Sequence, residues 1–240
     1  MTALRSLLFN LIFYGWTGCL CVLALPALLL PRDVLVFGGR IWARGTVVLL
    51  RFLVGLRHQV RGIENNPRGS AIYALKHQSA WDTLLLPVLF RDPMIVLKRE
   101  LIFIPLFGWY LVKTKQIAVD RSGRAAALKR MINAAKAGAG AGRPIVIFPE
   151  GTRVPPGESR PYHPGVAALY GLLDLPVVPV ALNSGFFWGR RRFLKKAGVI
   201  TVEFLPAISP GLERKAFLAE LNGRIEGACK RLADDARQAN

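Results

Sequence analysis

The longest uncharged run of the chain lies at its N-terminus and constrains the fold more than any other feature. No Asp, Glu, Lys or Arg occurs between Arg5 and Arg32, and the run from Ser6 to Pro31 consists mainly of leucine and other apolar residues. A helix of about 20 apolar residues crosses a hydrocarbon core of about 30 Å. This run is long enough to do so, and we interpret it as a membrane-attached helical segment.

A cleaved signal peptide is the alternative interpretation of the same run. The run is longer than the apolar region of an ordinary signal peptide, and most of the neighbouring positive charge follows it. The arginines that follow are Arg32, Arg40, Arg44, Arg51 and Arg57. Positive charge at one end of a spanning helix keeps that end in the cytoplasm. We therefore expect attachment to the inner (cytoplasmic) membrane, with the rest of the chain facing the cytoplasm.

A second apolar segment extends from Gly45 to Leu56. It is too short to cross a bilayer and contains Arg51, whose side chain can reach the headgroups from an interfacial or re-entrant helix. An ordinary core helix fits the same pattern. We assign residues 1–58 to an N-terminal membrane-anchoring region and residues 59–240 to one further domain, because 240 residues can bury a single core.

Composition favours a membrane-attached protein with an anionic partner. The chain is 52% hydrophobic with a mean hydropathy of +0.33, which is more apolar than an ordinary soluble domain. Its formal net charge of +18 favours an anionic bilayer, an acidic carrier protein or nucleic acid. Cys19, Cys21 and Cys229 indicate no disulfide framework. No His and Cys cluster has metal-ligand spacing, so we predict no metal.

Short runs rich in β-branched residues alternate with helical stretches from about residue 60 onward. Ser122 is expected to cap the clearest helix, in which apolar residues from Leu128 to Ala135 share one face. This alternation predicts an α/β fold, with a mixed, largely parallel sheet flanked by helices. The expected strands are Ala71–Leu75, Met94–Leu97, Gln116–Val119, Ile145–Phe148, Val177–Leu182 and Val199–Phe204.

Polar clusters follow three of these strands. Leu75 is followed by KHQSAWDT, Val119 by DRSGR and Phe148 by PEGTR. In open α/β sheets, the residues that bind and react lie on the loops that leave the carboxyl ends of the strands. We expect the three clusters to meet at one edge of the sheet.

The first cluster has the spacing of a catalytic dyad. His77 lies just past a strand, and Asp82 follows at the expected start of a helix. The carboxylate can reach back to one ring nitrogen, which fixes the tautomer and leaves the other nitrogen free to accept a proton. Such a dyad suits the activation of an external hydroxyl, although a purely structural pair is the alternative for these two residues alone. No GxSxG elbow occurs, which argues against a serine hydrolase.

The cluster FPEGTR, from Phe148 to Arg153, has the residues of an anion-binding turn. Gly151 permits a tight backbone turn, and the planar guanidinium of Arg153 can bind a phosphate with two parallel hydrogen bonds. Glu150 would hold the loop or bind hydroxyl groups of a substrate. A turn closed by a Glu–Arg pair is the alternative for the hexapeptide alone.

Taken together, these motifs resemble those of the glycerolipid acyltransferase family, in the branch that acylates 1-acylglycerol-3-phosphate. HxxxxD at His77–Asp82 and FPEGTR at Phe148–Arg153 carry most of the resemblance. Lys98–Leu101, Ile117–Arg121 and Val178–Leu182 are similar to further blocks of the family, which together extend over roughly residues 71–182. The N-terminal helices are also similar to those of bacterial members.

The resemblance implies a role for each motif. His77 is expected to be the general base that activates the free hydroxyl of the acceptor, and Asp82 to orient it. Lys98 and Arg153 are expected to hold the acceptor phosphate, with Arg121 as a third cation. The full set of residues expected to bind substrate is Lys98, Arg121, Glu150, Gly151, Thr152 and Arg153.

The implied reaction moves a fatty acyl group from acyl-CoA or acyl carrier protein to the sn-2 hydroxyl of 1-acylglycerol-3-phosphate. The product is phosphatidic acid, an intermediate of phospholipid biosynthesis, and no cofactor is needed besides the thioester substrate. An alternative acceptor is another lysolipid, such as a lyso-ornithine lipid. The alternative from a different class is a basic membrane adaptor without enzymatic activity.

Basic and aromatic residues alternate from Phe186 to Lys196, where RRR and KK are set among aromatic and leucine side chains. This mixture is typical of an anionic membrane interface. A solvated loop and a site for single-stranded nucleic acid are the alternatives. We expect membrane lipids as partners and no nucleic acid. The C-terminal helix is expected to pack through Leu221, Ile225 and Leu232, with Cys229 buried as an apolar residue.

Overall fold

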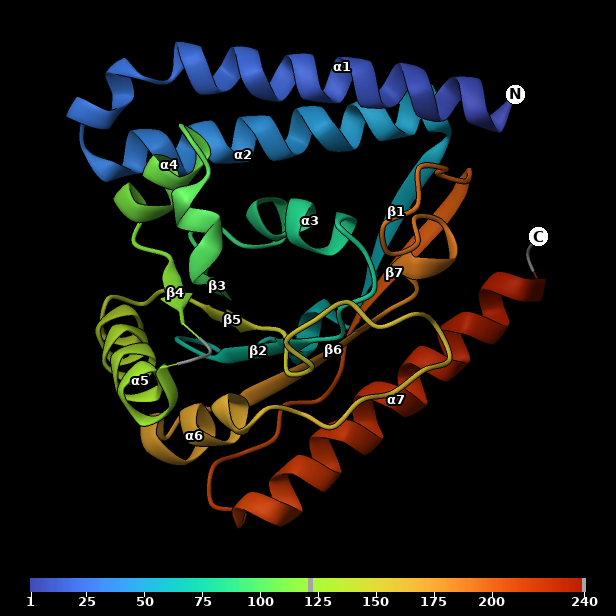
Figure 1. Cartoon of the computed structure of the whole chain (residues 1–240). Coiled ribbons are helices and arrows are strands. Elements are labelled where there is room, and N and C mark those ends of the chain that lie inside the picture. Colours follow the sequence, from blue (N-terminus) through green and yellow to red (C-terminus); the bar gives the residue numbers. More distant parts are fainter. Residues whose placement is uncertain (121–122, 239–240) are drawn as a thin grey trace.

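The computed structural model describes residues 1–120 and 123–238, with the backbone alone at Arg124. Helices cover both faces of one central sheet (Figure 1). The helices are α1 Thr2–Leu23, α2 Arg32–Leu49, α3 Trp81–Leu89, α4 Phe107–Lys113, α5 Arg124–Gly140, α6 Pro164–Leu173 and α7 Arg214–Gln238. Short helical turns are η1 Pro26–Leu29, η2 Leu50–Val54, η3 Ile63–Asn65, η4 Arg99–Phe103 and η6 Ser184–Phe186. The strands are β1 Leu56–Arg61, β2 Ile72–Leu75, β3 Met94–Lys98, β4 Ile117–Val119, β5 Ile145–Ile147, β6 Val177–Leu182 and β7 Gly198–Phe204.

The strands of the described chain form one sheet in the order β1-β7-β6-β2-β5-β3-β4. Neighbouring strands are parallel except for β6 and β7, which are antiparallel. The predicted α/β fold with a mixed, largely parallel sheet flanked by helices is confirmed. The carboxyl ends of β2 to β6 therefore point to one edge, where the polar clusters follow.

Each of the expected strands is present within one or two residues of its predicted ends. Strand β1 was not predicted, and it pairs with β7 from Leu56 opposite Gly198 to Arg61 opposite Glu203. The boundary that we placed after residue 58 therefore falls inside a strand of the sheet. Helix α5 has Gly123 at its N-cap instead of the expected Ser122, which lies outside the described residues, as does Arg121.

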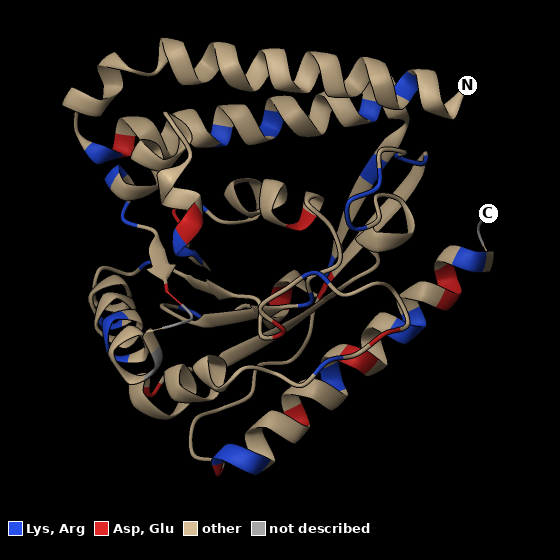
Figure 2. Cartoon of the chain, viewed as in Figure 1, with Lys and Arg blue, Asp and Glu red and all other residues tan. Residues whose placement is uncertain are grey.

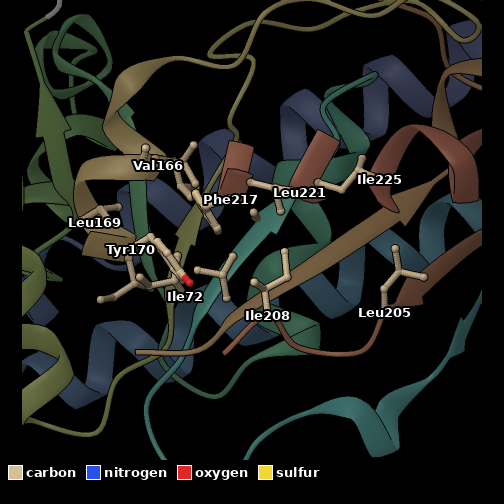
Figure 3. Close-up of a cluster of buried hydrophobic side chains, with 14 of the residues drawn as sticks. Ile72, Val166, Leu169, Tyr170, Leu205, Ile208, Phe217, Leu221 and Ile225 are labelled. Atoms are coloured by element: carbon tan, nitrogen blue, oxygen red, sulfur yellow. The ribbon is translucent and has the colours of Figure 1, made fainter. Parts of the chain in front are cut away.

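Two apolar cores lie on opposite faces of the sheet. Helices α5, α6 and α7 cover one face, where Tyr170 and Phe217 stack with their ring centroids 3.8 Å apart. Figure 3 shows side chains from α6, α7 and the sheet converging in this core. Leu221, Ile225, Leu232 and Cys229 are buried here, as expected for the C-terminal helix.

The other face of the sheet is covered by α3 and by the N-terminal helices. Trp81, Leu85 and Leu86 of α3 are buried there together with Phe9 of α1. In Figure 1, α1 and α2 form the outermost layer and lie side by side along their length. The N-terminal helices are therefore packed onto the folded domain.

The second apolar segment, Gly45–Leu56, does not form a helix of its own. Its first part ends the longer helix α2, the π-helical turn η2 follows, and Leu56 begins β1. Leu50 and Val54 are buried in the core, whereas Phe52 is 77% exposed. One side of the segment thus packs in the core, and the interfacial interpretation of its exposed side stays a prediction.

Small and polar residues hold α1 against α2. A Cβ atom on Gly45 would lie 2.7 Å from the Trp16 ring, so the glycine allows the two helices to approach. The indole nitrogen of Trp42 donates to Thr17 at 3.0 Å. Arg32 at the start of α2 donates to both carboxylate oxygens of Asp92, at 3.0 and 2.6 Å, and so attaches the helix pair to the domain.

The basic–aromatic segment contacts the start of α1. Lys195 is 2% exposed, and its ammonium donates to Asn10 at 2.7 Å and lies 4.6 Å from the centre of the Trp188 ring. Burial lowers the pKa of Lys195 to about 8. Phe193 is 50% exposed. Figure 2 shows basic residues gathered on this loop, between β6 and β7. Lys195 therefore holds the start of α1 against the domain, whereas Phe193 of the same segment lies at the protein surface.

Among the described helices, α1 is the one long and apolar enough to cross a membrane, and Ser6 and Phe9 are its only buried residues. We predict that removal of residues 1–31 prevents sedimentation of the protein with anionic vesicles in high salt, because α1 supplies the main exposed apolar surface. The shortened protein should also unfold at a lower temperature, since Phe9 leaves a buried site against Trp188.

A matched control replaces exposed Leu8 and Leu11 by serine in the full chain, which keeps the buried contacts of α1. This variant should bind vesicles more weakly with nearly unchanged thermal stability. Salt-resistant sedimentation of the shortened protein would contradict the assignment of α1 as the membrane-attached element.

Candidate active site

Polar residues follow the carboxyl ends of neighbouring parallel strands. His77 follows β2, and Arg153 lies on the loop after β5. Lys98 ends β3, and Asp120 follows β4. Because these strands are parallel neighbours, their carboxyl ends meet at one edge. The register brings together the clusters that the sequence singled out.

His77 and Asp82 form the predicted dyad. The Nδ1 atom of His77 lies 2.9 Å from Oδ2 of Asp82. The same oxygen accepts hydrogen bonds from the backbone N–H groups of Gln78 and Ser79, at 2.7 and 2.8 Å. Asp82 lies in the first turn of α3, whose N-terminus favours a negative charge. The carboxylate is therefore held as an acceptor, and Nδ1–H of the imidazole donates to it.

The imidazole ring is fixed by stacking as well. Its centroid lies 4.0 Å from that of the Phe148 ring, with 24° between the ring planes. Within the described part of the chain, Nε2 makes no hydrogen bond, and His77 lines a large cavity. The nitrogen that can accept a proton is thus available to a bound substrate.

The PEGTR loop turns back onto the histidine. Gly151 has φ +63°, a left-handed conformation that disfavours a side chain. After this turn the Val154 N–H donates to the His77 carbonyl at 2.8 Å. The expected tight turn at Gly151 is present, and it joins the two motifs through the backbone.

A buried ion-pair network lies behind the dyad. The ammonium of Lys76, which is 1% exposed, donates to Glu150 and to Glu226 of α7, each at 2.7 Å. Glu150 also accepts from the His77 N–H at 3.2 Å. Of the two roles expected of Glu150, these contacts support holding the loop. Glu150 is not among the residues that line the cavity, which differs from its expected place in the substrate-binding set.

Burial and the contacts of one cation with two carboxylates shift the pKa values of Lys76 and Glu150. Burial alone would lower the pKa of Lys76, but the hydrogen bonds and charges of Glu150 and Glu226 outweigh it and raise the pKa. Burial raises the pKa of Glu150, and Lys76 opposes this only in part. Lys76 is thus the cation that both carboxylates share.

The cavity in front of His77 has a volume of about 900 Å³. Apolar residues of α2, α3, α4 and α5 form much of its lining, and charged residues lie at several points of its wall. Of the expected substrate-binding residues, Lys98, Gly151, Thr152 and Arg153 line it. Arg121 lies outside the described residues. The cavity thus combines a proton acceptor, apolar walls and two of the expected cations.

Arg153 lies in an electropositive part of this cavity. Burial lowers the pKa of its guanidinium, and the charges of Arg190 and Arg191 act in the same direction, whereas Asp82 opposes them. Arg190 and Arg191 belong to the basic–aromatic segment and line the same cavity. An arginine remains charged under these conditions, so this region favours an anionic group.

This geometry agrees with the comparison to known families. The Acyltransferase family model matches residues 57–183, which include both the HxxxxD and the FPEGTR motifs. A 1-acyl-sn-glycerol-3-phosphate acyltransferase of Pseudomonas aeruginosa is 38% identical over 229 residues, which cover 93% of this chain and 88% of that protein. The chain belongs to the Acyltransferase family.

More distant relatives of this acyltransferase extend beyond bacteria. The human 1-acyl-sn-glycerol-3-phosphate acyltransferase alpha is 30% identical over 206 residues, which cover 83% of this chain and 71% of that protein. The crystal structure of the 1-acyl-sn-glycerophosphate acyltransferase PlsC from Thermotoga maritima has the same fold. The TM-score is 0.79 at 20% identity, with 97% of this chain and 98% of that chain covered.

Local sequence patterns did not indicate three parts of the acyltransferase site. These are the Lys76–Glu226 ion pair, the contact of Ser184 with Asp82, and the approach of Arg190 and Arg191 to Arg153. Lys76 directly follows the apolar strand β2 and precedes His77, and this position was the local signal of a buried charge.

We predict that Lys76→Met destabilises the acyltransferase strongly, because it leaves Glu150 and Glu226 near each other without a cation. Removal of one partner of a buried ion pair costs about 3–5 kcal/mol. Denaturant unfolding of the detergent-solubilised protein measures the loss. Lys136→Met, at an exposed position on α5, is the matched control and should change stability by less than about 0.5 kcal/mol. Equal stability of the two variants would show that the network is unimportant.

Proposed function

We propose that this chain transfers a fatty acyl group from a thioester donor to the sn-2 hydroxyl of 1-acylglycerol-3-phosphate, with phosphatidic acid as the product. The observation that carries the proposal is the His77–Asp82 dyad, which opens into a largely apolar cavity that also contains Lys98 and Arg153. The names of the relatives point to the same acceptor.

The reaction begins with proton transfer to His77. Nε2 removes the proton of the acceptor hydroxyl while its oxygen attacks the thioester carbonyl carbon, which forms a tetrahedral oxyanion. Asp82 stabilises the imidazolium that results, because its carboxylate accepts the Nδ1–H. Collapse of the intermediate re-forms the carbonyl and breaks the carbon–sulfur bond, and the imidazolium returns its proton to the leaving thiolate. No acyl-enzyme is needed in this sequence.

The cations of the cavity support a phosphorylated acceptor. Lys98 ends β3, and Arg153 follows the turn at Gly151, so both are held by the edge of the sheet. In this proposal these cations bind the phosphate monoester, its glycerol hydroxyl reaches His77 in the same cavity, and the apolar walls receive the acyl chains. The thioester donor, acyl-CoA or acyl carrier protein, is a substrate in this proposal, and no further cofactor is invoked.

Membrane attachment completes the proposal. Both substrate and product are membrane lipids, and α1 together with exposed apolar residues of α2 supplies a surface for the bilayer. The net charge of +18 favours the anionic cytoplasmic leaflet and an acidic carrier protein. We therefore place the enzyme at the inner membrane, with the catalytic edge on the cytoplasmic side.

The dyad gives the first test. We predict that His77→Ala lowers kcat by about 10²–10⁴, because a positioned general base contributes that much to the rate. Folding should be retained, since the imidazole is at the cavity wall. Transfer of a labelled acyl group to 1-acylglycerol-3-phosphate by purified protein is the measurement, with thermal unfolding as the control. Wild-type turnover by this variant would rule out the mechanism.

Arg153 gives a test of acceptor choice. Hydrogen bonds to charged groups contribute about 1.5–3 kcal/mol, so Arg153→Glu should raise KM for lysophosphatidate at least about tenfold. KM for the donor should change much less. Arg160→Glu, at an exposed position of the same connection, carries the same charge reversal away from the cavity and is the matched control.

The same assay separates two kinds of acceptor. If Arg153 binds the phosphate, the loss should be confined to lysophosphatidate and absent with a lysolipid that lacks a phosphate monoester, such as a lyso-ornithine lipid. Equal losses on both acceptors would show that Arg153 supports the loop, and would favour the acceptor without phosphate.

A further inference from the structure

The turn after β6 contacts the dyad loop at two points. Ser184 donates its hydroxyl proton to Oδ1 of Asp82 at 2.5 Å, and the Gly185 N–H donates to the side-chain oxygen of Gln78 at 3.0 Å. Ser184 is fully buried, and Asp82 is 2% exposed. Strand β6 is parallel to β2 and is its direct neighbour in the sheet. The turn therefore arrives at the same edge of the sheet as His77.

The residues on either side of Ser184 fix its position. Asn183 accepts from the Thr201 N–H at 2.9 Å and donates to the Leu232 carbonyl at 3.2 Å, which ties the turn to β7 and α7. A Cβ atom on Gly185 would lie 2.7 Å from Pro156, so this close approach requires glycine. Asn183 and Gly185 thus hold the hydroxyl group of Ser184 in a fixed position.

The hydroxyl completes the coordination of the orienting carboxylate. Oδ2 of Asp82 lies within hydrogen-bonding distance of three nitrogens, those of His77 Nδ1 and of the Gln78 and Ser79 backbone. Among the hydrogen bonds of the described residues, Ser184 is the one donor to Oδ1. Donors on both oxygens prevent rotation of the carboxylate about its Cβ–Cγ bond, and a fixed plane keeps the imidazole aimed at the cavity.

We propose that Ser184 is a positioning residue of the acyl transfer, holding the Asp82 carboxylate in the orientation that aligns His77. This inference rests on the proposed function, because Ser184 acts only through the dyad. Ser184 is the first residue beyond the segment 57–183 that the family model matches. Its role comes from the fold, which joins residues 102 positions apart.

Two variants remove or weaken the hydrogen bond. Ser184→Ala deletes the hydroxyl without adding bulk, and Ser184→Cys replaces it with a slightly larger thiol, which is a much weaker donor. Each should lower kcat about tenfold, with KM for lysophosphatidate and for the donor within about twofold of wild type. Thr201→Val removes another buried hydroxyl, which accepts from Gln59, and is the control expected to leave kcat within about twofold.

A double-mutant cycle tests whether Ser184 acts through Asp82. In an Asp82→Ala background, Ser184→Ala should change the remaining kcat by less than about twofold, because the group that it positions is gone. A full additional tenfold loss in that background would overturn the inference, as would a wild-type kcat for both Ser184 variants.

The controls separate this inference from the proposed function. If the wild-type protein and Thr201→Val transfer acyl groups and the Ser184 variants do so equally well, only the role of Ser184 is rejected. If the wild-type protein acylates no lysolipid, both the proposed function and the role of Ser184 are rejected. A rise in KM at unchanged kcat would also overturn the positioning role.

Discussion

The buried ammonium of Lys76 is the interaction on which the catalytic edge depends. It joins the end of β2, the PEGTR loop and helix α7, three segments that the chain order separates widely. Without this cation, two carboxylates would lie near each other inside the protein, where each would have to lose its charge or remain unpaired. The positions of His77 and of the FPEGTR turn therefore depend on a charge that does not line the cavity.

A second set of contacts determines how the dyad is aimed. The carboxylate of Asp82 accepts from its own helix start and, through Ser184, from the turn after β6. Phe148 stacks on the imidazole from the strand end that carries FPEGTR. The dyad is thus held by three neighbouring strand ends, which is the rigidity that proton transfer at a defined nitrogen requires.

Much of this organisation was predictable from the sequence because the signals are local. Buried strands such as β6 are continuous apolar runs, and the five-residue spacing of His77 and Asp82 fits one loop and one helical turn. Strand β1 escaped prediction because it is an edge strand with mostly exposed side chains, which carries no apolar pattern. The contacts of Lys76 with Glu226 and of Ser184 with Asp82 join residues 150 and 102 positions apart, and no local rule anticipates them.

Gly55 is the only residue of the chain between the end of the helix pair and the first strand of the sheet. It stands alone between Val54, the end of η2, and Leu56, the first residue of β1, in a left-handed conformation with φ +79°. If the helix pair lies on the bilayer as proposed, such a junction has no slack, and the catalytic edge keeps a constant height above the lipid surface. Every lipid substrate must then rise out of the leaflet by the same distance to reach His77.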